Sequence, residues 1–123
     1  MWLEIVKTLL SISDRRKDME LEKRERLSKA FQLMSDVIGK AAEDLQNNIY
    51  PTGSCIAMEQ LASDILKAVG DMMSKEDAKQ LSNQLHMASH LELEYAMREN
   101  PTTIPTLQKA QGKLLALSIL YSI

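Results

Sequence analysis

Cysteine, glycine, proline and aromatic residues are all scarce in this chain of 123 residues. The single cysteine, Cys55, cannot form an internal disulfide, whereas small secreted domains usually carry several. Four glycines, three prolines and five aromatic residues (one Trp, three Tyr and one Phe) supply few of the turns and β-favouring side chains of an all-β domain. These shortages exclude a disulfide-stapled domain and favour helices. We expect the chain to be cytoplasmic.

Charge of one sign and long apolar runs are also missing. Fifteen Lys and Arg face seventeen Asp and Glu, which gives a net charge of −2 and does not resemble a dedicated nucleic-acid binder. No apolar run reaches the roughly 18 residues of a transmembrane helix. Residues 2–10 are interrupted by Glu4 and Lys7 and lack the basic start of a signal peptide. A hydrophobic content of 45% suits one folded domain, which we expect to span residues 1–123.

Between three groups of turn-forming residues, apolar residues recur at helical spacing. We predict helices at residues 27–49, 54–73, 75–99 and 105–122, with Ser74 as the N-cap of the third in a capping box with Asp77. The clearest apolar stripe steps by four and three through Leu27, Phe31, Met34, Ile38, Ala41 and Leu45. Short connections make neighbouring helices antiparallel, so we expect an all-α protein with an antiparallel four-helix bundle in residues 27–123. An irregular orthogonal array of the same helices is the alternative.

Residues 1–26 are expected to form a helical extension of that bundle. Charges crowd residues 14–29, where three Glu-to-base pairs at i,i+4 predict that the long helix begins near Asp14. A possible capping box at residues 11–14 would separate a short amphipathic helix over residues 2–10. A single rod from Trp2 is the alternative, so the sequence leaves open whether residues 1–48 form one helix or two.

The N-terminal residues carry more apolar side chains than the polar half of the long helix can cover. A helix over residues 2–10 has an apolar face that docks on its own bundle or on a second copy; it has few of the basic residues of a membrane-surface helix. We therefore expect a non-catalytic protein-interaction or oligomerisation module that self-associates, with no cofactor or metal. The predicted contact surface comprises Trp2, Leu3, Ile5, Val6, Leu9, Leu10, Met19 and Leu21.

The alternative is an enzyme or metal site built on two histidines and the cysteine. His86 and His90 lie four apart on one predicted helix face, but Asn83 and Met87 stand where a Glu-x-x-His di-iron pattern would have glutamates. Cys55 lies in the first turn of its predicted helix, and antiparallel pairing would bring it within about a turn of His90. A buried, unreactive thiol is the ordinary interpretation of a cysteine on an apolar stripe.

Neither nucleotides nor nucleic acids are favoured as ligands. The four glycines are isolated and do not form a phosphate-binding loop. Residues 14–29 hold seven bases against five acids, interleaved along the helix, as on a solvated face.

A short segment carries a family resemblance. Tyr50-Pro51-x-Gly53-x-Cys55, following a charged helix, resembles helical modules at the front of multidomain bacterial signalling or defence proteins, cyanobacterial ones among them. The resemblance covers residues 20–65. It implies a helical adaptor that brings chains or domains together, although no effector domain follows in this chain.

Overall fold

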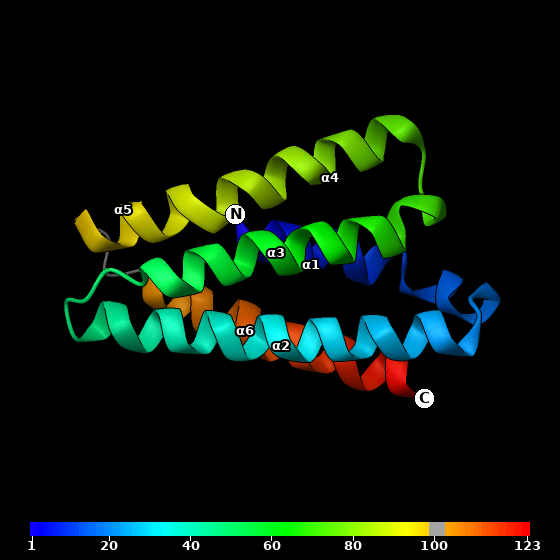
Figure 1. The fold of residues 1–123 in the computed structure, drawn as a ribbon, viewed down its shortest axis with the longest axis horizontal. Coiled ribbons are helices and arrows are strands. Elements are labelled where there is room, and N and C mark those ends of the chain that lie inside the picture. The colour runs from blue at the N-terminus through cyan, green and yellow to red at the C-terminus, as the bar shows by residue number, and fades with distance from the viewer. Residues whose placement is uncertain (99–102) are drawn as a thin grey trace.

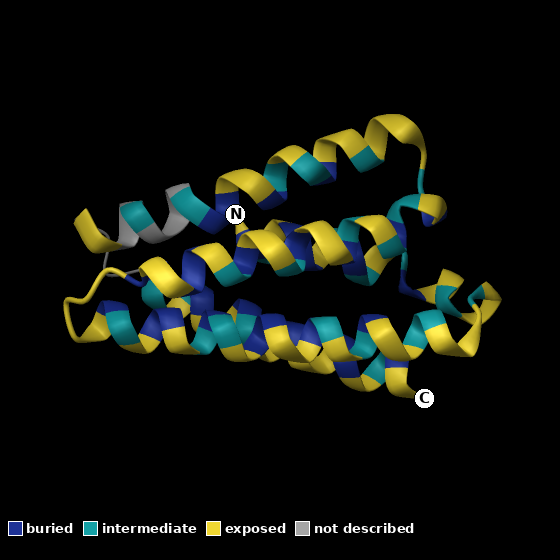
Figure 2. Ribbon diagram, viewed as in Figure 1, coloured by how far each residue is buried: buried dark blue, intermediate teal, exposed yellow. Residues whose placement is uncertain are grey.

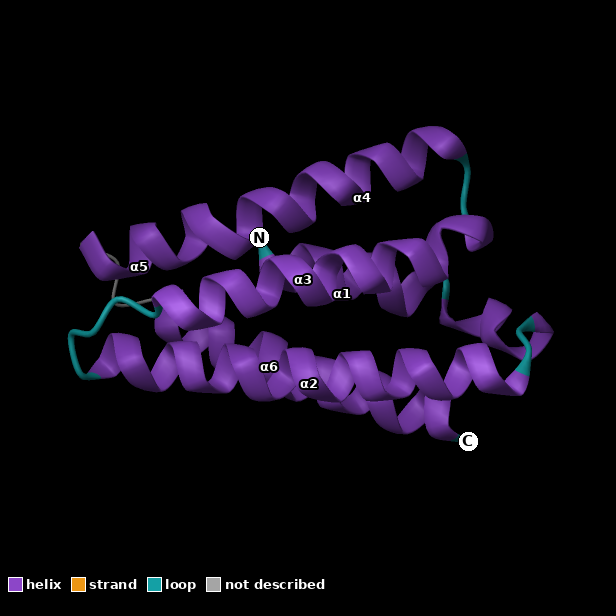
Figure 3. Ribbon diagram, viewed as in Figure 1, coloured by secondary structure: helices purple, strands orange, loops and turns teal. Residues whose placement is uncertain are grey.

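The protein is all-α in the computed structural model, which describes residues 1–98 and 103–123 (Figure 3). Its α-helices are α1 (Trp2–Ser11), α2 (Leu21–Gln46), α3 (Thr52–Val69), α4 (Lys75–Met87), α5 (Leu93–Arg98) and α6 (Thr103–Ser122). Two 3-10 segments, η1 (Ser13–Asp18) and η2 (Gly70–Met72), and a π-helical segment, η3 (Ala88–Glu92), complete the order. In the described part of the chain, none of these helices is long and apolar enough to cross a bilayer.

The helices predicted from spacing are present, with shifted ends. The second ends at Val69 and continues as η2, and the fourth begins at Thr103, two residues before Pro105. The third consists of α4, η3 and α5 in succession, and its predicted end at residue 99 lies outside the described residues. The cap that starts it is confirmed, because the Asp77 amide donates to Ser74 Oγ at 3.1 Å.

The helices pack around one core, and Figure 1 shows α3 alongside α2 and the α4–α5 segment alongside α3. The long helix α2 lies between α3 and α6, and α3 lies between α2 and α4. The helix α1 contacts both α4 and α6 and so lies between them. Where the chain passes from η3 into α5, α5 contacts α2 and α6 directly.

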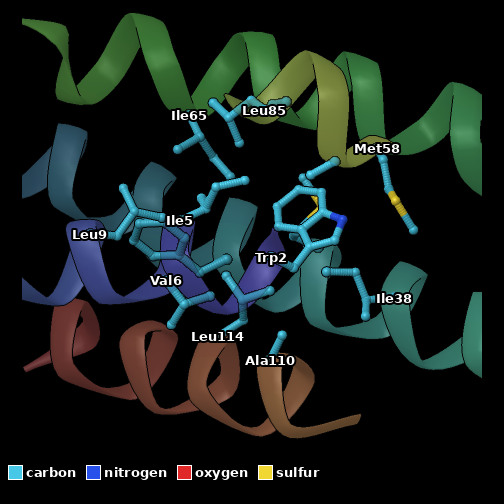
Figure 4. Packing of buried hydrophobic residues seen from close by; sticks show 14 of the residues in the cluster. Trp2, Ile5, Val6, Leu9, Ile38, Met58, Ile65, Leu85, Ala110 and Leu114 are labelled. Atoms are coloured by element: carbon cyan, nitrogen blue, oxygen red, sulfur yellow. The ribbon is translucent and has the colours of Figure 1, made fainter. Parts of the chain in front are cut away.

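The helix α1 is therefore part of the core, and the expectation that residues 1–26 extend from a bundle of residues 27–123 is wrong for this helix. Trp2, Ile5, Val6 and Leu9 are each at most 1% exposed. Figure 4 shows these side chains between Leu85 and Ile65 on one side and Leu114 on the other. Figure 2 shows the alternation of buried and exposed residues along α2 and α3. An amphipathic helix buries its apolar stripe against the nearest apolar surface, and here that surface is its own chain.

The segment between α1 and α2 differs from the prediction. The break after Ser11 is confirmed, but the capping box is wrong, because Ser11 Oγ donates to the Thr8 carbonyl at 2.6 Å. The long helix begins at Leu21 instead of Asp14, and within the described chain none of the three Glu-to-base pairs forms. Contacts across the fold hold η1 instead: the Arg15 guanidinium donates to the carbonyl of Met72 in η2.

Small and hydroxyl residues bring α2 and α6 close together. Ser28 Oγ donates to the Ser118 carbonyl and Ser118 Oγ donates to the Ser28 carbonyl, both at 2.7 Å. About two turns further along α2, Ser35 Oγ donates to the Gln111 carbonyl at 2.9 Å. A Cβ at Gly39 would collide with the Gln111 side chain, so this glycine marks a close approach between the two helices. These bonds fix an antiparallel register between the two helices.

Candidate functional site

A carboxylate on α3 bridges the two histidines of the α4–η3 segment. Glu59 Oε1 lies 2.5 Å from His90 Nε2 and 3.6 Å from His86 Nδ1. The two imidazole rings meet edge to face, with centroids 5.7 Å apart. The i,i+4 spacing places both rings on the helix face that packs toward α3. The spacing of the histidines in the sequence indicated one side of this cluster, and Glu59 was not predicted.

The cluster is an interhelical tether at the protein surface. The hydrogen bond from His90 lowers the pKa of Glu59 below the usual glutamate value, because the bond favours the charged carboxylate. The side chains of Glu59 and His90 are each 42% exposed, so solvent screens their attraction. Among the described residues, no group of three His, Cys, Asp or Glu side chains is arranged to hold a metal ion.

A small polar slot adjoins the cluster between α3 and α4. Its volume is about 210 Å³, and its lining includes Ser63, Ser82 and Ser89 beside Glu59 and His86. Ser89 Oγ donates to the Leu85 carbonyl at 2.8 Å, within its own helix. Ligand pockets for small molecules usually hold about 300–1,000 Å³. The slot has room for solvent or a very small polar molecule.

The lone cysteine is buried near the start of α3. Cys55 is 4% exposed, and its thiol donates to Tyr50 Oη at 3.8 Å. Burial raises the pKa of Cys55 and outweighs the opposing effect of the Tyr50 hydrogen bond. The thiol contacts Tyr50 while His90 contacts Glu59, so the structure gives the two members of the hypothetical Cys–His dyad different partners.

The contact surface predicted at the N-terminus is mostly used by the protein itself, and that prediction needs correction. Four of its eight residues, Trp2, Ile5, Val6 and Leu9, lie in the core. Leu3, Leu10 and Met19 are partly buried against the same core, and only Leu21, at 60%, is well exposed. The apolar face that membrane-surface binding through this helix would use is covered by the core of the same chain.

Exposed apolar residues gather instead on the outer face of α6. Leu115, Ile119 and Ile123 are 45%, 56% and 77% exposed, although the opposite face of α6 fills the core with Leu114, Leu117 and Tyr121. Gly112 and Ala116 are also exposed and lie between the larger residues. We call these five residues the α6 stripe: Gly112, Leu115, Ala116, Ile119 and Ile123. Helical spacing predicted the inner face of this helix, with Leu114, Leu117 and Tyr121, but did not identify the outer face as a separate apolar surface.

Comparison with known proteins adds no relative. No known protein family, curated protein or solved structure matches this chain. What the fold defines is the class: an all-α protein whose N-terminal helix completes its core.

Proposed function

We propose that this chain is a non-catalytic protein-interaction module that self-associates through the α6 stripe. The observation that carries the proposal is a helix that is apolar on both faces. A helix of this kind is normally covered on both sides. No charged residue follows Lys113 in α6, and the core already covers the inner face.

A second copy of the chain is the occupant that the α6 stripe fits best. A Cβ added at Gly112 would meet no atom within 4 Å, so the stripe has a notch beside the large side chains of Leu115 and Ile119. In a two-fold contact, each copy offers the same surface, and a ridge of one enters the notch of the other. The stripe itself bears no charge that would select a charged partner.

Charges at the two ends of the stripe also suit an antiparallel pair. The register set by the Ser28–Ser118 and Ser35–Gln111 bonds places Glu25 level with Tyr121, near the C-terminal end of the stripe. Lys109, which is exposed, lies one turn before Gly112 at the other end. An antiparallel partner therefore brings the Lys109 of one copy toward the Glu25 of the other, twice by symmetry.

The non-catalytic part of the proposal rests on what the reactive side chains do. The thiol is buried with a raised pKa, and the two imidazoles face a charged carboxylate that ties α3 to α4. Both arrangements stabilise the fold, as expected of structural residues. The resemblance of residues 20–65 to adaptor modules agrees with this proposal.

Sedimentation equilibrium of the full chain, from low-micromolar to sub-millimolar concentration, tests self-association. We expect a monomer–dimer equilibrium that Ile119→Lys abolishes. Ile56→Lys is the matched control, because Ile56 is 64% exposed on α3 and Ile119 is 56% exposed on α6. A wild-type chain that stays monomeric throughout, or an Ile119→Lys variant that still dimerises, would refute the proposal.

A charge exchange tests the geometry of the dimer. Glu25→Lys and Lys109→Glu should each weaken the dimer by bringing like charges together, and the double variant should recover most of the affinity. Equal losses that simply add in the double variant would exclude the antiparallel arrangement. Circular dichroism would establish that each variant keeps the helical content of the wild type.

A further inference from the structure

We infer that the groove between α2 and α3 binds an acidic amphipathic helix of another protein. This α2–α3 groove has a volume of about 550 Å³. It lies on the side of α2 that faces α3, whereas the α6 stripe lies beyond α2 on the other side. The inference therefore does not depend on self-association, and the two surfaces can be occupied at the same time.

The floor of the groove is apolar and partly open to solvent. Leu33 from α2 is 50% exposed, and Leu61 from α3 and Ala30 from α2 are partly buried beside it. Exposed leucines and alanines in a furrow between two helices match the apolar side chains that a third helix presents at i, i+3, i+4 and i+7. An occupant with apolar side chains on one face would remove this surface from water.

The rim of the groove is basic although the chain as a whole is acidic. Arg26 and Lys29 from α2, Lys67 from α3, and Lys23 line it, with Asp64 as the one acidic residue in the lining. The whole chain carries a net charge of −2, so this excess of positive charge is local. Bases stand on both helices that flank the apolar floor. An occupant with carboxylates on both sides of its apolar face is complementary to this pattern.

Three of the four bases are available to a partner. Lys23 pairs with Asp71 at 3.3 Å. Within the described residues, Arg26, Lys29 and Lys67 are in no ion pair, since the intrahelical pairs expected with Glu22 and Glu25 do not form. A partner's carboxylates could therefore bind these groups without first breaking a salt bridge.

The composition of the groove favours a helix over a nucleic acid or a membrane. Single-stranded nucleic acids are usually held by aromatic side chains that stack on bases, and the lining of this groove contains none. A lipid surface is read by an exposed, protruding apolar face with bases around it. Here the apolar residues form the floor of a furrow and the bases form its edges.

Fluorescence anisotropy with a labelled synthetic peptide tests the inference on the full chain. The probe is a helical peptide of about 18 residues, five turns long, with leucines on one face and glutamates on both flanks. The control peptide has lysine in place of every glutamate. We expect saturable binding of the glutamate peptide that weakens as salt is added, and no binding of the lysine peptide. Equal binding of both peptides would overturn the inference.

Variants of the groove make the test specific. Lys29→Glu should lower the affinity for the glutamate peptide by about fivefold or more, and Asp64→Lys should raise it. The matched control is Lys79→Glu, a charge reversal at an exposed position on α4 outside the groove. Unchanged affinity in both groove variants would refute the assignment. So would a single-stranded oligonucleotide or phosphatidylserine vesicles binding at the groove in preference to the peptide.

The monomeric Ile119→Lys variant separates this inference from the proposed self-association. It should bind the glutamate peptide with the affinity of the wild type, because the α6 stripe and the groove are different surfaces. Loss of peptide binding in this variant would contradict the independence of the two surfaces. A wild-type chain that binds the peptide without dimerising would support the groove and refute only the α6 contact.

Discussion

Replacing Trp2 with alanine tests whether the N-terminal helix holds the core together. Trp2 is 1% exposed and is among the largest fully buried side chains. Burial of about 200 Å² of aromatic surface, at about 25 cal/mol per Å², corresponds to about 5 kcal/mol. Measured Trp→Ala losses in protein cores are about 3–5 kcal/mol. A domain has about 5–15 kcal/mol of stability in total, so Trp2→Ala should remove a large share of it.

Urea unfolding followed by far-ultraviolet circular dichroism measures this loss without depending on tryptophan fluorescence. At about 2 kcal/mol per M, the midpoint should fall by about 2 M. Ile56→Ala is the control, since Ile56 is 64% exposed and its truncation should change the free energy of unfolding by less than about 0.5 kcal/mol. A loss below about 1 kcal/mol for Trp2→Ala would show that α1 is not part of the core. The apolar face of α1 would then be free for a partner.

Three further results follow from the structure. At concentrations where the chain is monomeric, Gly112→Ala should raise the free energy of unfolding by up to about 1 kcal/mol, because the added Cβ lies in open space on a helix. Gly39→Ala should raise it less in the same urea assay, because the added Cβ must displace the Gln111 side chain. Glu59→Gln should lower Tm at neutral pH. Because its pKa is lowered, Glu59 stabilises the fold above the ordinary glutamate range, and this stabilisation is lost as the pH falls through the lowered pKa. The difference in Tm from wild type should therefore shrink in acid and vanish below that pKa; a difference that persists there would refute the tether. Cys55 should react slowly with a thiol reagent in the folded protein and rapidly in urea, and equally fast reaction in both states would contradict its burial and raised pKa.

Local signals in the sequence were enough to predict the helices. The stripe from Leu27 to Leu45 is buried throughout, and the Ser74 cap forms as expected. Both features can be predicted from the identity and spacing of residues a few positions apart. The start of the long helix was predicted wrongly because η1 is held by the distant carbonyl of Met72, a contact that spacing alone does not encode.

The destination of an apolar face is harder to predict than its existence. The pattern of Trp2, Ile5, Val6 and Leu9 is the same whether the helix packs on its own chain or on another copy. The structure shows the first. What decides it is the apolar surface that α4 and α6 offer to α1, which results from the packing of all the helices together.

The sequence predicted only part of the cluster formed by Glu59, His86 and His90. The four-residue spacing of His86 and His90 identified one side of the cluster, but Glu59 was missed. A signal for it was present: antiparallel pairing that brings Cys55 within about a turn of His90 also brings Glu59, one turn further along α3, opposite His90. The pairing was used to place a nucleophile beside the histidine, whereas the residue that lies there is a carboxylate.

The contact between α1 and α6 joins segments about a hundred residues apart in the chain. In most small helical bundles, contacts are local and folding is correspondingly fast. Here α1 is synthesised well before its packing partner α6, so its tryptophan and aliphatic side chains are uncovered in the meantime. The core can close only after synthesis of α6, so until then the nascent chain exposes an apolar helix that chaperones or other nascent copies can bind.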